Sequence, residues 1–305
     1  MKHWKRFFTL GAAALLTITA VTGCGLKGGK AGSSTASSKT ITIGAKAFTE
    51  NQIVAEVYAK ALEDEGYKVN RKFDISASVI HTAIQNKQID LYPEYTGTGL
   101  ITILKRQPIT DAEKVYDTVK KLYKAKYQIT WLDYAKANDG QGLAVTTEVA
   151  KKYHIQTISD LQKVASKLRF ASQGEFDERE DGIPALEKTY GKFHWKSSKI
   201  YDNSLKYQVL SSKKADVAPV YTTEGNLSDT DKYTLLKDDK KVWPPYNLAP
   251  IVRDDVLKEH KEIAEILNKV NKKFTTENLT KLNAKVDIEK EDYEDVAEEF
   301  YDSIR

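Results

Sequence analysis

Hydrophobic and polar positions change period along this chain, and the changes predict alternating strands and helices. Residues 40–45 alternate threonine with isoleucine, which is typical of a strand. Residues 53–62 place apolar side chains at helical spacing, and Gly66 follows as a stop signal. Residues 68–75 are predicted to be a second strand. A strand, a helix and a strand in this order predict a parallel βαβ unit with a right-handed crossover.

The same reasoning extends to the rest of the chain and predicts an α/β fold. Capping-box spacing predicts helix N-caps at Thr49 and Thr110, and a further helix is expected to start at Ser159. Further strands are expected at 129–133, 143–145, 168–171, 217–221 and 249–252. Further helices are expected at 79–86, 110–126, 183–190, 204–211, 255–270, 276–286 and 293–304.

A tyrosine-containing pattern occurs twice and organises the predicted fold. Residues 216–225 are a degenerate copy of residues 90–99, and Tyr221 corresponds to Tyr95. Each copy follows a predicted helix and is itself predicted to be a strand that ends in a Thr/Gly loop led by the tyrosine. Ligands of α/β sheets bind beyond the carboxyl ends of strands. The two tyrosines are therefore expected to face one another across a cleft between two similar lobes.

The length of 305 residues suits two lobes. The short strand at 143–145 and the proline-rich segment at 242–247 are interpreted as the two crossings between them. One lobe inserted into another through two crossings predicts hinge closure on a ligand. The predicted division is lobe 1 at 40–142 and 249–305, lobe 2 at 143–248, and hinge crossings near 143–146 and 244–250.

The first residues are predicted to be a targeting segment. Residues 1–23 combine a basic start with a short apolar run, which predicts a secretory signal. The segment ends in a pattern that resembles a bacterial lipobox, which implies that Cys24 is lipidated. The alternative is an ordinary signal peptide with a stray cysteine, although Cys24 is the only cysteine. Residues 24–39, rich in Gly, Ser and Lys, are expected to be a flexible linker. The expected location is extracytoplasmic, lipid-anchored to the outer face of the bacterial cell membrane.

Charge and motif content argue against several function classes. The net charge of +4 includes Lys2, Lys5 and Arg6 of the leader, so the remainder is nearly neutral. Basic and acidic residues are interspersed, which is unlike a nucleic-acid-binding surface. The sequence has neither metal-ligand spacing nor a nucleophile motif. We therefore expect no metal, no cofactor and no enzymatic activity; a lipid-anchored enzyme and an adhesin are the remote alternatives.

Five motifs together resemble one known family, the substrate-binding lipoproteins of quaternary-amine ABC importers. The motifs are IGAKAFTE at 43–50, YPEYTGT at 92–98, EREDG at 178–182, YTTEG at 221–225 and PPY at 244–246. The resemblance covers essentially all of the chain after the linker. It implies a type II periplasmic-binding-protein fold of cluster F. It also implies a monomer that delivers glycine betaine, carnitine, choline or a related betaine to an ABC permease with its ATPase.

The resemblance also implies an aromatic cage formed by Tyr95, Tyr221 and Tyr246. A methylated ammonium cannot donate N–H bonds, but a tyrosine face within about 6 Å attracts it through the ring quadrupole. The carboxylate of a betaine is expected to meet Lys46, Thr98 and Arg179. Lys46 has independent support, because its loop follows a predicted strand and precedes a helix N-terminus. A salt bridge with neighbouring acidic residues is the alternative for Arg179.

Two departures from the family pattern concern the ligand. Gln141 stands where many members carry a further cage tyrosine, and Tyr134 is a nearby aromatic that would fill the gap. Gly99 stands where choline-selective relatives often carry aspartate, which argues against choline. The ligand is therefore expected to be larger or more polar than glycine betaine, and carnitine, choline, proline betaine and ergothioneine are the alternatives.

Overall fold

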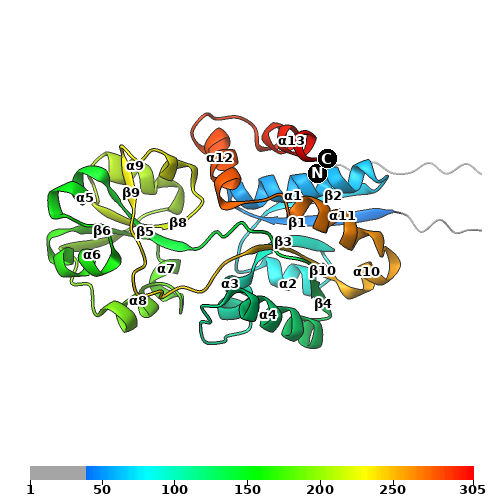
Figure 1. Ribbon diagram of the computed structural model, residues 1–305, viewed down its shortest axis with the longest axis horizontal. Helices are drawn as coiled ribbons and strands as arrows, with labels where there is room; N and C mark the ends of the chain where they lie inside the picture. Colours follow the sequence, from blue (N-terminus) through cyan, green and yellow to red (C-terminus); the bar gives the residue numbers. More distant parts are fainter. Residues whose placement is uncertain (1–38) are drawn as a thin grey trace, which may run out of the picture. The chain divides into compact units, whose positions relative to one another are not determined.

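Two five-stranded sheets carry the fold of residues 39–305, the part of the chain that the computed structural model describes. Each sheet has helices on both of its faces (Figure 1). This arrangement confirms the predicted α/β class with two lobes. The predicted signal peptide, Cys24 and nearly all of the predicted linker lie outside the described residues.

The first sheet has the strand order β2-β1-β3-β10-β4. Strand β1 runs parallel to β2 and β3, and β10 is antiparallel to β3 and β4. The predicted parallel βαβ unit is thus confirmed as β1, α1 and β2. The strands are β1 (Thr40–Lys46), β2 (Lys68–Ile75), β3 (Leu91–Tyr95), β4 (Ile129–Trp131) and β10 (Leu248–Arg253). The helices are α1 (Thr49–Asp64), α2 (Ile80–Gln85), α3 (Thr96–Thr98), the π-helix η1 (Gly99–Ile103), α4 (Ala112–Tyr127), α10 (Asp254–Glu259), α11 (Glu262–Asn271), α12 (Thr276–Asp287) and α13 (Tyr293–Ile304).

The second sheet repeats this arrangement with the order β7-β6-β8-β5-β9. Strand β6 is parallel to β7 and β8, and β5 is antiparallel to β8 and β9. The strands are β5 (Gln141–Thr146), β6 (Arg169–Ser172), β7 (Ser197–Ile200), β8 (Val217–Tyr221) and β9 (Tyr233–Leu235). The helices are α5 (Thr147–Tyr153), α6 (Ile158–Val164), α7 (Glu175–Glu178), α8 (Ile183–Tyr190) and α9 (Lys206–Ser211), with 3-10 turns η2 (Ala165–Lys167), η3 (Asn203–Leu205) and η4 (Gly225–Ser228).

The sequence repeat is also a structural repeat. Strands β3 and β8 hold the same central place in their sheets, with a parallel neighbour on one side and an antiparallel neighbour on the other. The aspartate before each strand accepts a backbone N–H of the neighbouring parallel strand. Asp90 accepts the backbone N–H of Thr42 at 2.7 Å, and Asp216 accepts that of Arg169 at 2.8 Å. The expectation that Tyr95 and Tyr221 end equivalent strands is confirmed.

The two passages between the sheets are residues 132–140 and 236–247, and the repeated threonines hold them. Thr222 Oγ1 accepts the backbone N–H of Gly140 at 2.8 Å, and Thr96 Oγ1 accepts that of Asn247 at 3.0 Å. The first crossing was expected near 143–146, but those residues belong to β5, which is paired on both sides. Continuous pairing fixes a strand inside its sheet, so the passage ends before residue 141.

The predicted helix N-caps are wrong by one residue or more. Helix α1 has Phe48 at its N-cap, and the Thr49 hydroxyl donates instead to Asp287 at 2.6 Å. Helix α4 is capped by Asp111, whose carboxylate accepts the N–H of Lys114 at 2.9 Å. The helix expected to start at Ser159 begins one residue earlier and carries a capping box with Thr157 at its N-cap. Where several cap-forming residues are adjacent, local sequence does not choose between them.

Gly225 is needed where η4 packs against α12. A Cβ at this position would lie 2.5 Å from backbone atoms of Ala284. We expect Gly225→Ala to lower the free energy of unfolding by about 1–3 kcal/mol, because an inserted methyl forces packed backbones apart. Urea denaturation measures the change. Gly140→Ala is the matched control, since its Cβ would be 3.7 Å from the nearest atom. Equal stability of the two variants would show that α12 moves away without cost.

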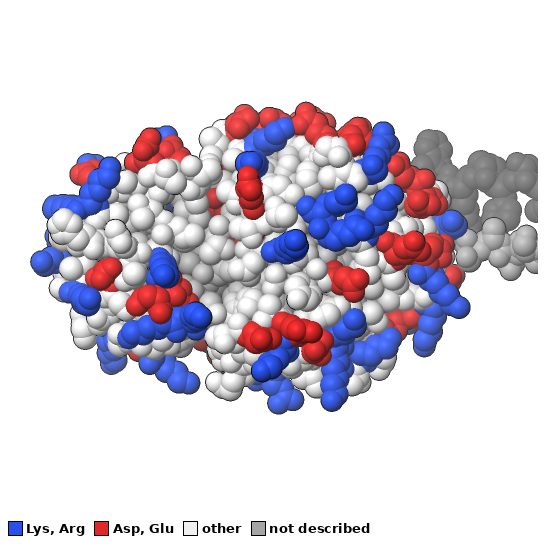
Figure 2. Space-filling model, viewed as in Figure 1, with Lys and Arg blue, Asp and Glu red and all other residues white. Residues whose placement is uncertain are grey.

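The described surface carries both signs of charge. Figure 2 shows Lys and Arg interspersed with Asp and Glu over the visible face. Between residues 39 and 305, no three His, Cys, Asp or Glu side chains are grouped so that they would hold a metal ion. In the same range, every helix is too short or too polar to cross a membrane.

Candidate ligand-binding site

A cavity of about 450 Å³ lies at the ends of β5 and β8; we call it the arginine cavity. Tyr221 ends β8 and Gln141 begins β5, and the antiparallel register places these two residues directly opposite one another. Strand pairing therefore brings an aromatic ring and an amide to the same wall. The lining residues are Gln141, Gln173, Glu175, Phe176, Arg179, Ile200, Tyr201, Asp202, Asn203 and Tyr221.

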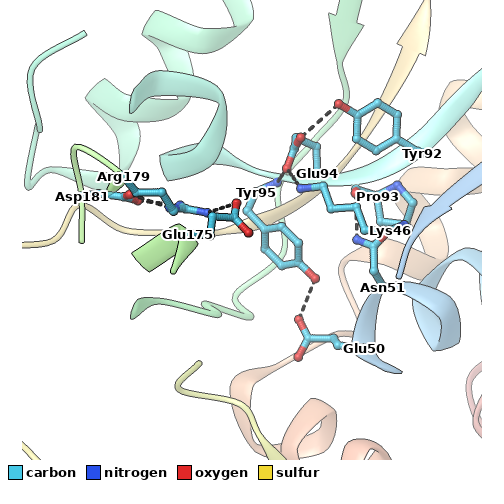
Figure 3. Close-up of polar contacts among 10 residues, drawn as sticks. All are labelled: Lys46, Glu50, Asn51, Tyr92, Pro93, Glu94, Tyr95, Glu175, Arg179 and Asp181. Carbon is cyan, nitrogen blue, oxygen red and sulfur yellow. Dashed lines mark hydrogen bonds and ion pairs between the residues drawn. The ribbon is translucent and has the colours of Figure 1, made fainter. Parts of the chain in front are cut away.

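Arg179 supplies the cationic group of the arginine cavity. It holds Asp181 in a bidentate ion pair, with Nε–Oδ1 at 2.8 Å and Nη2–Oδ2 at 2.7 Å (Figure 3). The salt-bridge alternative for Arg179 is thus confirmed for Asp181. Nη1 lies 3.7 Å from the exposed carboxylate of Glu175. A guanidinium has five N–H donors, and the two bonds to Asp181 leave the others for a ligand.

Both members of this pair are charged. Burial alone would lower the pKa of Arg179, but the hydrogen bonds and charge of Asp181 outweigh it and raise the pKa above its ordinary value. Burial alone would raise the pKa of Asp181, and the bonds from Arg179 and from the Tyr246 hydroxyl bring it below its ordinary value. The guanidinium of Arg179 therefore keeps its positive charge over the whole physiological pH range.

A second cavity of about 580 Å³ lies between the two lobes; we call it the acidic cavity. It shares Tyr221, Asp202 and Asn203 with the arginine cavity, so the two adjoin. Its wall carries five acidic side chains but only two ammonium groups. The lining residues are Ala47, Phe48, Thr49, Glu50, Asp139, Asp202, Asn203, Ser204, Lys206, Tyr207, Tyr221, Thr223, Glu224, Asn226, Asn283, Asp287 and Lys290.

Phe48 connects the two repeated tyrosines. Its ring centroid lies 6.1 Å from that of Tyr95 and 6.0 Å from that of Tyr221, and it stacks on the latter. Phe48 and Tyr221 both line the acidic cavity, whereas Tyr95 does not. Phe48 belongs to the motif at 43–50 but was not predicted to be a site residue. Its place in the loop after a strand, beside Lys46, is the signal that would have found it.

Tyr95 and Tyr246 are buried and lie off the linings of both cavities. The Tyr95 hydroxyl donates to Glu50 at 2.9 Å (Figure 3). The Tyr246 hydroxyl donates to Asp181, and its ring packs against Gly97, where a Cβ would lie 2.6 Å from the ring. Burial raises the pKa of these two phenols and that of Tyr221, so all three rings are neutral.

Lys46 is committed to Glu94. Its side chain is buried, with 4% exposed, and Nζ makes an ion pair with Glu94 (Figure 3). The same ammonium lies 5.1 Å from the ring centroid of Tyr95. The second lobe repeats this contact, because Lys206 pairs with Glu224 and lies 5.5 Å from the ring centroid of Tyr221. Each repeated tyrosine therefore has its own lysine–glutamate pair.

Of the remaining predicted residues, only Gln141 lines one of the two cavities. Thr98 is half-buried at the end of α3 and lines neither cavity. Tyr134 packs against Tyr116 with ring centroids 4.8 Å apart, at the edge of a core cluster of the first lobe. Gln141 therefore faces the arginine cavity without Tyr134. A side chain at Gly99 would collide with Trp131, because a Cβ there would lie 2.7 Å from the indole.

The sequence and the structure are both similar to those of known solute-binding proteins of ABC transporters. A family model described as the substrate-binding domain of ABC-type glycine betaine transport systems matches residues 39–303. A carnitine transport binding protein of Listeria monocytogenes is 36% identical over 97% of this chain and 96% of its own length. An ergothioneine transport permease/ergothioneine binding protein of Helicobacter pylori is 32% identical over 87% of this chain and 48% of its own length. The crystal structure of a glycine betaine/carnitine/choline ABC transporter protein is 30% identical, with a TM-score of 0.74 over 86% of this chain and 98% of that one.

Proposed function

Because the chain belongs to the family of substrate-binding domains of ABC-type glycine betaine transport systems, we infer that it captures a quaternary ammonium zwitterion and delivers it to an ABC permease. The observation that carries the choice of ligand class is the arginine cavity. It places the ring of Tyr221 and the guanidinium of Arg179 around one space. An aromatic face attracts a methylated ammonium, and a guanidinium attracts a carboxylate.

In the proposed binding mode, the cation lies against Tyr221 with Gln141 beside it. Phe48 joins the cage as a further ring. Tyr95 and Tyr246 stay proposed cage residues of lower rank, because they are buried and line neither cavity. Arg179 takes the carboxylate. Lys46 and Thr98 stay proposed carboxylate partners of lower rank, because Lys46 is already paired with Glu94 and neither residue lines the arginine cavity. Closure of the lobes would exclude water and strengthen each of these electrostatic contacts.

The preferred solute is glycine betaine, carnitine, choline or a related betaine. Gln141 favours a solute with polar groups, because a buried amide needs hydrogen-bond partners. Proline betaine and ergothioneine are therefore the alternatives, and the relative from Helicobacter pylori supports the second. Both are methylated amines and would use the same aromatic rings.

The proposal includes the features that lie outside the described residues. We infer a signal peptide at 1–23, a lipidated Cys24 and a linker to residue 39, which would tether the protein to the outer face of the cell membrane. Lobe 1 would comprise the first sheet with its helices, residues 40–131 and 248–305, and lobe 2 would comprise the second, residues 141–235. The protein would act as a monomer without enzymatic activity.

Calorimetric titration of the protein lacking residues 1–38 tests the proposed function. The solutes are glycine betaine, carnitine, choline, proline betaine and ergothioneine, with glycine as the unmethylated control. Saturable binding of at least one methylated amine, without binding of glycine, is expected. If every methylated amine failed to bind, the proposed ligand class would be wrong.

Tyr221 is the residue on which the proposed cage most depends. We expect Tyr221→Ala to weaken binding of the preferred methylated amine about tenfold or more, the scale of one desolvated cation–π contact. Calorimetric titration measures the change, and the thermal unfolding of the unliganded protein should move little. Tyr221→Phe is the matched control, because it keeps the ring face. Unchanged affinity of Tyr221→Ala would remove this residue from the cage.

A further inference from the structure

The deep wall of the acidic cavity is built from hydrogen-bond acceptors. Glu50 accepts the Tyr95 hydroxyl at 2.9 Å and the Asn283 side-chain amide at 3.0 Å. The same amide nitrogen donates to the backbone oxygen of Thr223 at 2.9 Å, which links the two lobes. The amide oxygen of Asn283 has no hydrogen-bond partner within residues 39–305, although Asn283 is only 3% exposed.

Two further groups on this wall lack full hydrogen bonding. The hydroxyl of Thr223, which is 1% exposed, also has no partner of good geometry among the described residues. Asp139 is 6% exposed and accepts only the backbone N–H of Thr223, at a long 3.4 Å. Burial raises the pKa of Asp139 and that of Glu50 above their ordinary values. The charge of Glu50 adds to the effect on Asp139, and the charge of Glu224 adds to the effect on Glu50. Buried acceptors in native proteins are normally satisfied.

The lysines of the acidic cavity do not supply the missing donors. Lys206 is paired with Glu224. Lys290 is exposed and donates to the backbone oxygen of Asp287 at 2.6 Å. A trimethylammonium group does not supply them either, because it has no N–H. The Thr223 hydroxyl has a single hydrogen and supplies one donor at most, to Glu50 or Asp139. The remaining acceptors on this wall, the amide oxygen of Asn283 among them, therefore fit a donor that arrives with the solute.

We propose that the acidic cavity is a second recognition pocket, which accepts a hydrogen-bond-donating hydroxyl or N–H group of the bound solute on Asp139, Glu50 and the amide oxygen of Asn283. The proposal rests on the function inferred above. It adds that the solute carries a donor group besides its methylated ammonium. Phe48 and Tyr221 line the acidic cavity together with these acceptors, so one molecule reaches both.

A pair of solutes that differ by one hydroxyl tests this pocket. Carnitine carries the hydroxyl, and γ-butyrobetaine is the same molecule without it. We expect the wild-type protein to bind carnitine at least about tenfold more tightly, because a site built from acceptors is left unsatisfied by the analogue that lacks the donor. In Asp139→Leu the ratio should fall to about one, mainly through weaker carnitine binding. Asp139→Asn, which keeps an oxygen acceptor, should give an intermediate ratio.

Asp229→Asn is the control, because Asp229 lies on the surface outside both cavities. It should keep the wild-type ratio. Equal binding of the two solutes by the wild-type protein would overturn the proposal while leaving the proposed function intact. A preference for carnitine that persists in Asp139→Leu would overturn it as well. If neither solute bound, nor any other methylated amine, the proposed function itself would fail. If Asp139→Leu does not fold, the isosteric Asp139→Asn takes its place, and an unchanged wild-type ratio in that variant would overturn the proposal.

Discussion

Replacing Lys46 with methionine is expected to lower the free energy of unfolding by about 3–5 kcal/mol, the range for removing one partner of a buried ion pair. Glu94 is 1% exposed and would lose the ammonium that pairs with it. Its other partners, the Tyr92 hydroxyl at 3.0 Å and the Tyr95 N–H at 2.8 Å, carry no positive charge. Urea denaturation of the unliganded protein measures the loss.

The double variant Lys46→Met/Glu94→Gln separates charge from packing. A glutamine at 94 carries no charge, its one carbonyl oxygen still accepts from the Tyr95 N–H, and its NH2 group can donate to the Tyr92 hydroxyl oxygen, so most of the lost stability should return. The double variant also tests whether Lys46 contacts the ligand. If the double variant binds glycine betaine as tightly as the wild-type protein, then Lys46 stabilises the Tyr95 loop and does not contact the carboxylate of the ligand. A double variant as unstable as Lys46→Met would mean that the buried charge is not the cause.

The sequence predicted those parts of the fold whose signal is local and periodic. Residues 40–45 alternate, residues 53–62 follow a helical period, and both elements are present as β1 and α1. Strands β7 and β9 were not predicted. Strand β7 is exposed at all four of its positions and lies at the sheet edge, so it has no buried face and no alternation. Strand β9 has only three residues, too few to show a period.

The candidate site was predictable where a repeat marked it and not where distant residues meet. The repeat placed Tyr95 and Tyr221 on equivalent strand ends, as the sheets confirm. The partner of Lys46 was hidden, because Glu94 is brought to it only by the parallel pairing of β1 with β3. Local sequence also gave no sign that Phe48 stacks on Tyr221, since these residues belong to different lobes.

The acidic cavity could not be predicted either, because its wall is built from residues that are distant in the sequence. Asp139 belongs to a passage between the sheets, Glu50 to α1 and Asn283 to α12, so three distant segments build the acidic wall. A composition rich in carboxylates indicates only solvated helix faces. Burial turns three of these polar groups into a candidate recognition surface, and burial is a property of the packed lobes.

Replacing Arg179 with glutamine is expected to weaken glycine betaine binding by at least about 30-fold. Removing the charged partner of a buried carboxylate costs about 2 kcal/mol or more, and about 1.4 kcal/mol corresponds to a factor of ten in affinity. The loss should depend on the ligand. Choline has a similar cationic head but a hydroxyl in place of the carboxylate, so whatever its affinity for the wild-type protein, that affinity should change much less.

Comparing these two solutes separates two roles of Arg179, because the residue also holds Asp181, which accepts the Tyr246 hydroxyl. A variant that only released Asp181 would loosen Tyr246 and weaken both ligands alike. A selective loss of glycine betaine, measured by calorimetric titration, would instead place the carboxylate on the guanidinium. An equal loss for both ligands would make Arg179 a positioning residue for Tyr246. The carboxylate would then need another partner in the arginine cavity, where Gln141, Gln173 and Asn203 are the side-chain amides.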